Sequence, residues 1–239
     1  MGQKINPNSF RLGITKNWNS RWFPKNLNFK DQLEEDVLIR RVIQEKIAPA
    51  GIVSVEIERG VNNVYRVFIK AARPGLIIGR GGKGIEDLSK AIEAEMRKLI
   101  AKRGVLKPSV SLSLNVEELK RTDIAAQYMA QSIAWDLERR LPSRKTIKKY
   151  VETALQNRSV QGVKIKLSGR VDGAEIARRD WLAKGKLPLQ TLRANIDYGT
   201  ATAFTTFGTV GIKVWLYKGQ IFDTRLEEEK KPTRNNDNR

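Results

Sequence analysis

The sequence predicts an α+β fold in which two units of mixed secondary structure follow one another along the chain. The first observation is that several short segments alternate apolar and polar residues, as half-buried strands do. The second is that longer segments between them repeat apolar residues at helical spacing. The third is size, because 239 residues with 40% hydrophobic content can form one large domain or two smaller ones, each with its own core.

The net charge of the chain indicates a polyanionic partner. The formal net charge is +19 and the isoelectric point is about 10.2. An excess of this size concerns partners and not the fold, and the main candidates are nucleic acid and an anionic membrane surface. No apolar run reaches the roughly 18 residues that a membrane-spanning helix needs. We therefore expect nucleic acid, and no membrane, among the partners.

The composition also excludes several kinds of chemistry, since the chain contains no cysteine and no histidine. Disulfides, thiol nucleophiles, Cys/His zinc sites and imidazole acid–base catalysis are all removed. We expect no catalytic residues, no metal, no cofactor and no small-molecule substrate. The first residues lack the apolar core of a signal peptide, so the expected location is cytoplasmic.

Residues 1–30 form a basic and aromatic extension that prolines and a glycine interrupt. Its charges would attract phosphates, and its rings could stack on unpaired bases, so the segment suits RNA. The alternative is that the rings pack on the body of the protein. The cations that we expect to contact RNA here are Lys4, Arg11, Lys16 and Arg21.

The first unit begins with a predicted helix over 31–47, whose apolar stripe comprises Leu33, Val37, Ile43 and Ile47. Two strands follow, over about 53–58 and 64–71, and the short turn between them makes them antiparallel. After a glycine-rich loop comes a second helix, whose stripe comprises Leu88, Ile92, Met96 and Leu99. A further alternating strand spans 110–116.

The glycine-rich loop is the most specific motif of this unit, with four glycines and two cations in 79–84 directly before an amphipathic helix. Glycine allows close approach of the backbone, and a helix start offers unpaired N–H groups, so the loop suits a phosphate. A dinucleotide fingerprint matches only in spacing, because Pro74 interrupts the approach and the expected acidic residue is missing. A P-loop fails, because it needs glycine at position 77 and serine or threonine at position 84.

A third interpretation is the Gly-x-x-Gly loop of a KH domain, which clamps the backbone of a nucleic acid. A fourth is a glycine-rich turn without a ligand. The predicted order is helix, strand, strand, short helix, Gly-x-x-Gly, helix, strand, which is that of a type II KH domain and favours the third. The residues expected to bind RNA are Gly79, Arg80, Gly81, Gly82 and Lys83.

The second unit opens with two predicted helices. The first starts from a cap at Thr122 or Asp123 and keeps helical apolar spacing as far as Leu141. Pro142 then breaks the helix and Ser143 caps the next one. Four cations gather on the polar side of that second helix, with no acidic residue among them until position 152. The ordinary interpretation is a solvated helix face. The alternative is an RNA-binding face formed by Arg144, Lys145, Lys148 and Lys149.

Strands are expected over 162–169, 192–198 and 211–217, with a loop and a short helix over 170–179. The charged and polar end of the chain predicts disorder. The sequence thus divides into a basic extension over 1–30, an RNA-binding domain over 31–118, a second domain over 119–225 and a disordered tail over 226–239.

Several blocks, in order along nearly the whole chain, resemble the family of bacterial small-subunit ribosomal protein three. They lie at 2–8, 11–14, 72–82, 168–178, 192–198 and 211–215, and residues 225–239 fall outside the resemblance. The resemblance implies an N-terminal type II KH domain. It also implies a C-terminal α/β domain with two helices packed on a mostly antiparallel sheet.

The resemblance further implies a structural role in the small ribosomal subunit. It implies binding to small-subunit rRNA in the head, beside neighbouring ribosomal proteins, and a share in lining the channel through which mRNA enters. The family's basic helix matches Arg144, Lys145 and Lys148 here. Because position 81 is glycine, backbone contacts alone are expected from that residue. Further cations expected to contact rRNA are Arg170, Arg178 and Arg179.

Two other functions stay open at the level of sequence. A free KH protein could bind or process RNA outside a ribosome, and co-sedimentation with small subunits would distinguish it. A lyase that attacks abasic DNA with a lysine amine is the enzymatic alternative, which borohydride trapping would detect. Nothing marks one lysine as activated, so we expect no enzyme.

Overall fold

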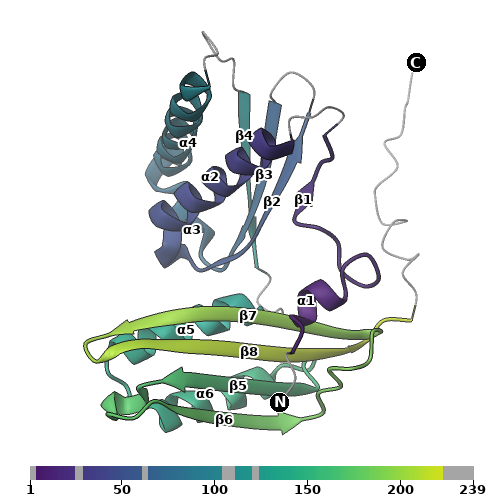
Figure 1. Cartoon of the computed structure of the whole chain (residues 1–239), viewed down its shortest axis with the longest axis vertical. Coiled ribbons are helices and arrows are strands. Elements are labelled where there is room, and N and C mark those ends of the chain that lie inside the picture. The colour runs from purple at the N-terminus through teal and green to yellow at the C-terminus, as the bar shows by residue number, and fades with distance from the viewer. Residues whose placement is uncertain (1–3, 25–28, 61–63, 104–110, 120–123, 223–239) are drawn as a thin grey trace.

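The computed structural model describes residues 4–24, 29–60, 64–103, 111–119 and 124–222, which form two units, each built on a four-stranded sheet (Figure 1). The predicted α+β fold class is confirmed. The strand order is β1-β2-β3-β4 in one sheet and β6-β5-β8-β7 in the other. The divisions at residues 30, 118 and 225 stay predictions, and the predicted disordered tail over 226–239 lies outside the described residues.

The N-terminal unit has the element order of a type II KH domain. Its elements are α2 (Phe29–Ile47), η1 (Ala48–Ala50), β2 (Ile52–Arg59), β3 (Val64–Ala71), α3 (Pro74–Ile78), η2 (Arg80–Gly82), α4 (Lys83–Lys102) and β4 (Ser111–Glu118). β2 and β3 are antiparallel, whereas β3 and β4 are parallel, because α3 and α4 form the crossover between them. The three helices lie on one face of the sheet (Figure 1). In α4, Ile100 and not Leu99 completes the buried stripe.

The buried side of α2 differs from the predicted stripe. Ile43 is buried as expected, but Leu33 and Val37 are 46% and 51% exposed. Two carboxylates, Glu35 and Asp36, lie on the buried side instead. The prediction was wrong because hydropathy assigns acidic residues to solvent, whereas these two have cationic partners inside the fold.

Glu35 is the acceptor for three donors from other elements. Arg59 Nη1 donates to it at 2.6 Å, Arg103 Nη1 at 2.7 Å and the Tyr65 hydroxyl at 2.8 Å. Burial, and then the negative charge of Glu35, raise the pKa of Tyr65. The carboxylate therefore ties β2, β3 and the end of α4 to α2, and its removal would take one charged partner from each of two guanidinium groups.

Asp36 connects α2 to the N-terminal segment, which we define as residues 4–24. It accepts from Arg59 Nη2 at 2.8 Å and from the Ser20 hydroxyl and the Trp22 indole at 2.9 Å each. The Arg59 guanidinium also lies over the Trp22 ring, 4.5 Å from its centroid. These contacts hold β1 (Ser20–Arg21) beside β2, to which it is parallel.

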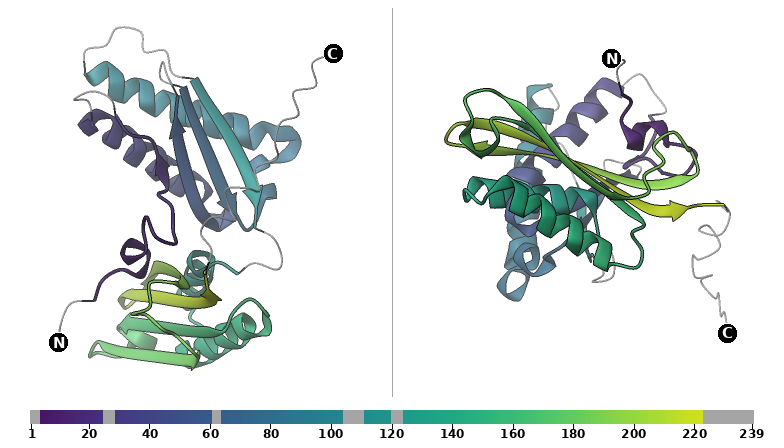
Figure 2. Two further views of the ribbon diagram at one scale, coloured as in Figure 1. Left: turned by 90° about the vertical axis from the view of Figure 1, so that its right-hand side faces the viewer. Right: turned by 90° about the horizontal axis from the view of Figure 1, so that it is seen from below.

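The C-terminal unit consists of two helices on one face of an antiparallel sheet, as predicted (Figure 2). Its elements are α5 (Ala126–Glu138), α6 (Ser143–Gln156), β5 (Gly162–Gly169), η3 (Val171–Gly173), β6 (Arg178–Gly185), β7 (Ala194–Thr205) and β8 (Gly208–Gln220). All neighbouring strands are antiparallel. The core lies between the sheet and the helices and draws on α5, α6, β5, β7 and β8.

Two features of this unit were predicted wrongly, and a third prediction concerns residues outside the described ranges. β6 was not predicted, because this edge strand mixes charged, small and apolar residues without an alternating pattern. α5 ends at Glu138, so Leu141 lies beyond it and is 44% exposed. The predicted caps, Thr122 and Asp123, lie outside the described residues. Within them, the Asp197 carboxylate of β7 accepts from the Ala126 nitrogen at 2.8 Å and stabilises the start of α5.

Among the described residues, the two units contact each other in two ways. The N-terminal segment packs α1 (Pro7–Phe10) against β7 and pairs β1 with β2, so it bridges both sheets (Figure 1). Directly between the units, Gly51 lies against the Tyr128 ring of α5. A Cβ at Gly51 would be 2.6 Å from that ring, and its φ of +69° also favours glycine.

The Glu35 interactions give a stability prediction with a matched control. Glu35→Gln should lower the free energy of unfolding by about 3 kcal/mol, because two guanidinium groups that are only 10% and 22% exposed each lose a charged partner. Glu34→Gln removes an acid that also pairs with Arg103, at 2.6 Å, but its side chain is 55% exposed. Glu34→Gln should therefore lower the free energy of unfolding by less than about 1 kcal/mol. Urea unfolding followed by circular dichroism measures both, and equal costs would contradict the network.

Candidate nucleic-acid interface

The glycine loop leaves the start of α4 open. Gly79, Gly81 and Gly82 have φ values of +68°, +63° and +81°, which turn the chain sharply between α3 and α4. Within the described residues, no side chain caps the first N–H groups of α4. These donors and the positive end of the helix dipole face the loop, so an anion fits at this position.

The glycines of the loop have two different purposes. A Cβ on Gly84 would lie 2.4 Å from the Ile77 carbonyl oxygen, and one on Gly79 would lie 3.0 Å from the Gly84 nitrogen. These two glycines therefore let α3 and α4 approach closely. Gly81 and Gly82 have nothing within 4 Å of a Cβ position, so their backbone is accessible.

Arg80 and Lys83 flank this accessible backbone. Both side chains are exposed, and neither has a hydrogen bond or ion pair with any described residue. The loop thus combines open N–H groups with two available cations, the arrangement that a phosphodiester backbone needs. RNA binding by 79–83 stays a prediction.

α6 presents a row of cations on its exposed side, while the opposite side packs in the core through Thr146, Ile147, Val151 and Ala154. Within the described residues, Arg144, Lys145 and Lys148 have no acidic partner. Lys149 differs, because its Nζ lies 3.7 Å from Asp136 of α5. The sequence shows no acid within this row until position 152, and the partner of Lys149 comes from another helix.

The first turn of α6 concentrates positive charge. Arg144 and Lys145 lie where the helix dipole is positive and where acidic residues would be stabilising, yet that turn has none. Asp172 of η3 compensates in part, accepting from the Ser143 nitrogen at 3.0 Å and from its hydroxyl at 2.7 Å. Ser143 is therefore the first helical residue and not the predicted cap. Cations at the positive end of a helix dipole lower the stability of the fold, and a bound anion would offset this loss.

Arg11 requires a correction, because it was expected to contact RNA. Its side chain has no exposed area, and its guanidinium donates to four carbonyl oxygens at 2.8–3.0 Å, those of Pro7, Leu189, Thr191 and Ala194. Burial lowers the pKa of this guanidinium. Arg11 thus anchors the N-terminal segment to the C-terminal unit and offers nothing to a ligand.

The other predicted rRNA contacts fall into two groups. Four are engaged within the chain, which reduces their availability: Lys16 with Asn8 and Asp197, Arg21 with Glu56 and Glu58, Arg170 with the carbonyls of Ala174 and Phe207, and Arg178 with Asp172 and Asp180. Burial is the main cause that lowers the pKa of Lys16. Lys4 and Arg179 are exposed, with no hydrogen bond or ion pair to the residues that the structure describes.

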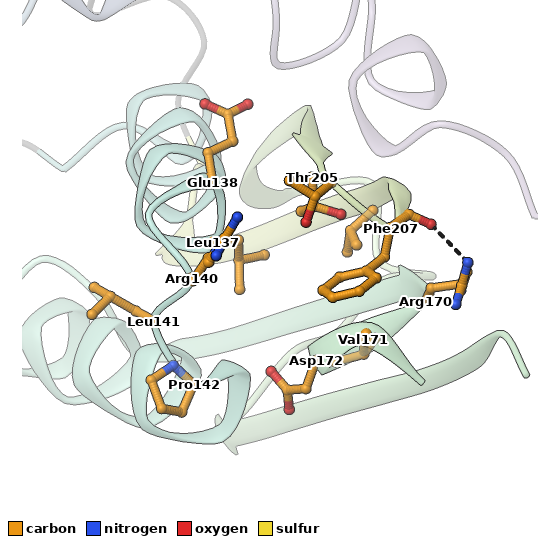
Figure 3. Close-up of a pocket in the computed structure, with 13 residues that line it drawn as sticks. Leu137, Glu138, Arg140, Leu141, Pro142, Arg170, Val171, Asp172, Thr205 and Phe207 are labelled. Carbon is orange, nitrogen blue, oxygen red and sulfur yellow. Dashed lines mark hydrogen bonds between the residues drawn. The ribbon is translucent and has the colours of Figure 1, made fainter. Parts of the chain in front are cut away.

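A cavity of about 290 Å³ lies between the α5–α6 turn, η3 and the β7–β8 hairpin (Figure 3). Its walls are largely apolar, with the Phe207 ring on one side and Leu137, Leu141 and Pro142 on the other. Two of the nearby polar groups are engaged in the fold: Arg170 donates to the Phe207 carbonyl at 3.1 Å, and Asp172 caps α6. Arg140 also lines the cavity, and its exposed side chain has no ion pair with a described residue, so a single cation stands beside largely apolar walls.

Sequence reasoning missed a further group of cations and rings. Lys164, Lys166, Lys213, Trp181 and Trp215 lie on the face of the C-terminal sheet opposite α5 and α6. Alternation in β5 could place the first two on one face, but their neighbours depend on β6, which was not predicted. Across the described ranges, no helix is long and apolar enough to cross a membrane. The same ranges hold no cluster of three or more potential metal ligands.

Comparison with known proteins gives matches along nearly the whole chain. Residues 38–124 match the family described as KH domain, and residues 133–216 match ribosomal protein S3, C-terminal domain. Similar relatives carry the name small ribosomal subunit protein uS3. That of Desulforamulus reducens is 45% identical over 232 residues, 97% of each chain. That of Caldicellulosiruptor saccharolyticus is 45% identical over 221 residues, 92% of this chain and 94% of the relative. That of Hydrogenovibrio crunogenus is 42% identical over 236 residues, which are 98% of this chain and 97% of the relative.

The glycine loop gives a residue-resolved prediction. When single-stranded RNA is added, the amide NMR signals of Gly81, Gly82 and Lys83 should shift, because their N–H groups meet phosphate. Arg80→Glu should weaken this response about tenfold, whereas Lys90→Glu, the same change farther along α4, should leave it intact. Unchanged signals in the presence of bound RNA would make the loop a turn only.

Arg11 gives a second prediction, which tests its structural role. Arg11→Met keeps much of the apolar volume but leaves buried carbonyl oxygens without a donor, so it should cost about 3 kcal/mol of stability. The N-terminal segment should also become sensitive to protease. Arg21→Met, in the same segment, replaces a side chain that is 48% exposed and should cost less than about 1 kcal/mol. Equal behaviour of the two variants would refute the anchoring role.

Proposed function

The chain belongs to the ribosomal protein S3 family, whose members are named small ribosomal subunit protein uS3, and from this premise we propose that α6 faces the mRNA where it enters the subunit. The family predicted from sequence is confirmed. The chain is a structural constituent of the small ribosomal subunit, it associates with rRNA, and it is located in the ribosomes of the bacterial cytoplasm. It is not an enzyme, and the free KH protein is no longer needed as an alternative.

The observation that carries the proposal is the unpaired charge on α6. Arg144, Lys145 and Lys148 are exposed and have no acidic partner within the described part of the chain, and two of them stand at the positive end of the helix dipole. Some exposed cations elsewhere in the described residues do have an acid beside them, as Lys98 has Glu95 at 2.6 Å. The row contains no acidic residue and begins at the positive end of the helix dipole. Its positive electrostatic potential therefore supports contact with the phosphate backbone of a strand that moves past it.

Such contacts suit mRNA because they do not depend on sequence. Phosphate contacts position a strand without recognising its bases, as a translated message requires. The anchoring of α6 in the core fixes the backbone positions from which the cations extend, so the strand would meet the same row of charges at each step. Lys149, held near Asp136, stands at the edge of this row and contributes less to the proposed contact.

We assign rRNA contacts in the head of the subunit, beside neighbouring ribosomal proteins, to other surfaces. The exposed cations Lys4 and Arg179 and the glycine loop over 79–83 are the best available among the residues expected from sequence. Arg170, Arg178, Lys16 and Arg21 would first have to exchange their partners within the chain. This assignment rests on charge and exposure and is tested by crosslinking in assembled subunits.

The role of α6 predicts a defect that depends on mRNA structure. Changing Arg144, Lys145 and Lys148 to Ala should leave folding and assembly intact, because the replaced side chains are exposed. Elongation should slow on a message with a stable downstream hairpin and change little on an unstructured message. Loss of three phosphate contacts should also lower the log–log salt dependence of mRNA binding by about 2.

The ratio of elongation rates on the two messages, in subunits rebuilt with each variant, measures the effect. Lys145→Ala and Lys149→Ala form a matched pair, since each removes one charge from the same helix. Lys145→Ala should have the larger effect. An unchanged ratio for the triple variant in fully assembled subunits would exclude the channel position.

A further inference from the structure

The face of the C-terminal sheet opposite α5 and α6, which we call the outer face, carries both cations and aromatic rings. The pairing of the strands defines it, because Lys166 of β5 stands opposite Trp181 of β6 on one side and Lys213 of β8 on the other. Lys164 stands opposite Trp215 in the same way. Figure 1 looks onto this face, with α5 and α6 behind the sheet, and Figure 2 shows the helices on the opposite side.

The cations of the outer face lack neutralising acids. The outward positions of β5–β8 include Lys164, Lys166, Arg179 and Lys213, and no Asp or Glu occupies such a position in the described strands. Asp180 and Asp197, which belong to these strands, stand on the helix side, in register with Leu167 and Leu216. The like charges are therefore uncompensated within the face.

This arrangement costs stability in the free protein. Lys166 and Lys213 are directly opposite in adjacent strands, where like charges repel. Partial burial, followed by the positive charges of Arg179, Lys213, Lys4 and Lys164, lowers the pKa of Lys166. A sheet surface that served only as solvent contact would gain from mixed charges, so the repulsion indicates a surface that an anion covers.

Aromatic rings stand among these cations. Trp181 is 62% exposed and Phe204 is 72% exposed. Lys164 Nζ lies 5.3 Å from the centroid of Trp181 and 5.8 Å from that of Trp215, so the amine sits between two indoles. The Trp215 ring in turn lies 5.4 Å from Tyr198 of β7. Exposed rings are costly in water, and a base is a ligand that covers a ring while its phosphate meets a cation.

We propose that the outer face binds unpaired nucleotides of rRNA, with bases stacked on Trp181 and its neighbouring rings and phosphates on Lys166, Lys213 and Arg179. A single strand fits better than a duplex, because a duplex keeps its bases stacked inside and has no use for exposed rings. Ser168, Thr200 and Thr202 add hydroxyl groups on the same face, which can hydrogen-bond to sugars or base edges. This surface is separate from α6, and the proposal does not depend on the mRNA role of that helix.

The first test needs no variant. The full chain is mixed with oligouridine and irradiated with ultraviolet light, and the nucleotide-bearing peptides are mapped by mass spectrometry. Adducts should appear on the peptides that contain Trp181 or Trp215, and a double-stranded RNA of the same length should not produce them. Absence of adducts from both peptides, with adducts elsewhere in the chain, would overturn the proposal.

The second test separates charge from stacking. Trp181→Leu should weaken binding of oligouridine at this face about tenfold, as judged by adduct yield at Trp215, without changing the salt dependence. Lys166→Ala with Lys213→Ala should lower the log–log salt slope by about 1.4, at 0.7 for each phosphate contact. Lys184→Ala removes an exposed charge from β6 on the helix side of the sheet, in register with Val163, so it is the control and should change neither. Thermal unfolding of each variant shows that the fold is retained.

A protein partner is the alternative that the experiments separate. If oligouridine leaves Trp181 and Trp215 unmodified, and the variants bind RNA normally but fail to enter small subunits, the outer face contacts another ribosomal protein and the proposal is wrong. If adducts form and the variants behave as stated, the RNA assignment holds whatever the outcome for α6.

Discussion

The position of the two units depends on buried charges that hold the N-terminal segment to each of them. Arg11 inserts its guanidinium into the C-terminal unit and donates to carbonyl oxygens there, while Asp36 of α2 accepts from Ser20 and Trp22. A buried charge is expensive unless its hydrogen bonds are satisfied, so each end has essentially one favourable geometry. The segment between them therefore acts as a fixed bridge, and the contact of Gly51 with Tyr128 supplements it.

The same physical distinction separates structural cations from the cations that we propose bind RNA. Arg11, Arg59 and Arg103 have their donors taken by carbonyls or carboxylates and hold the fold together. Lys145 and Lys166, by contrast, lie among like charges or against a helix dipole, with no acid beside them in the described part of the protein. Net charge alone does not distinguish these classes, because both contribute equally to the total of +19. The acidic or carbonyl partners that each cation has in the folded structure distinguish the two classes.

This distinction also explains what could be predicted from the sequence. Hydrophobic periodicity located α4, α6 and β5, and the element order located the glycine loop, because these features depend on neighbours within one segment. The buried side of α2 could not be found, since Glu35 is buried only through partners from β2, β3 and the end of α4. The structural role of Arg11, the capping of α6 by Asp172 and the composition of the outer face likewise depend on contacts between distant segments. A long-range partner of this kind leaves no local pattern.

The central claim is that cations without acidic partners contact RNA in the ribosome, whereas paired cations do not. The reactivity of each lysine toward a small acylating reagent, measured by mass spectrometry, tests it most directly. The measurement compares the free chain, the assembled small subunit and the subunit with bound mRNA. Lys166 and Lys213 should lose reactivity on assembly, Lys145 and Lys148 should lose it when mRNA binds, and Lys98, paired with Glu95, should change little. Equal reactivity of the unpaired lysines in all three states would contradict the account.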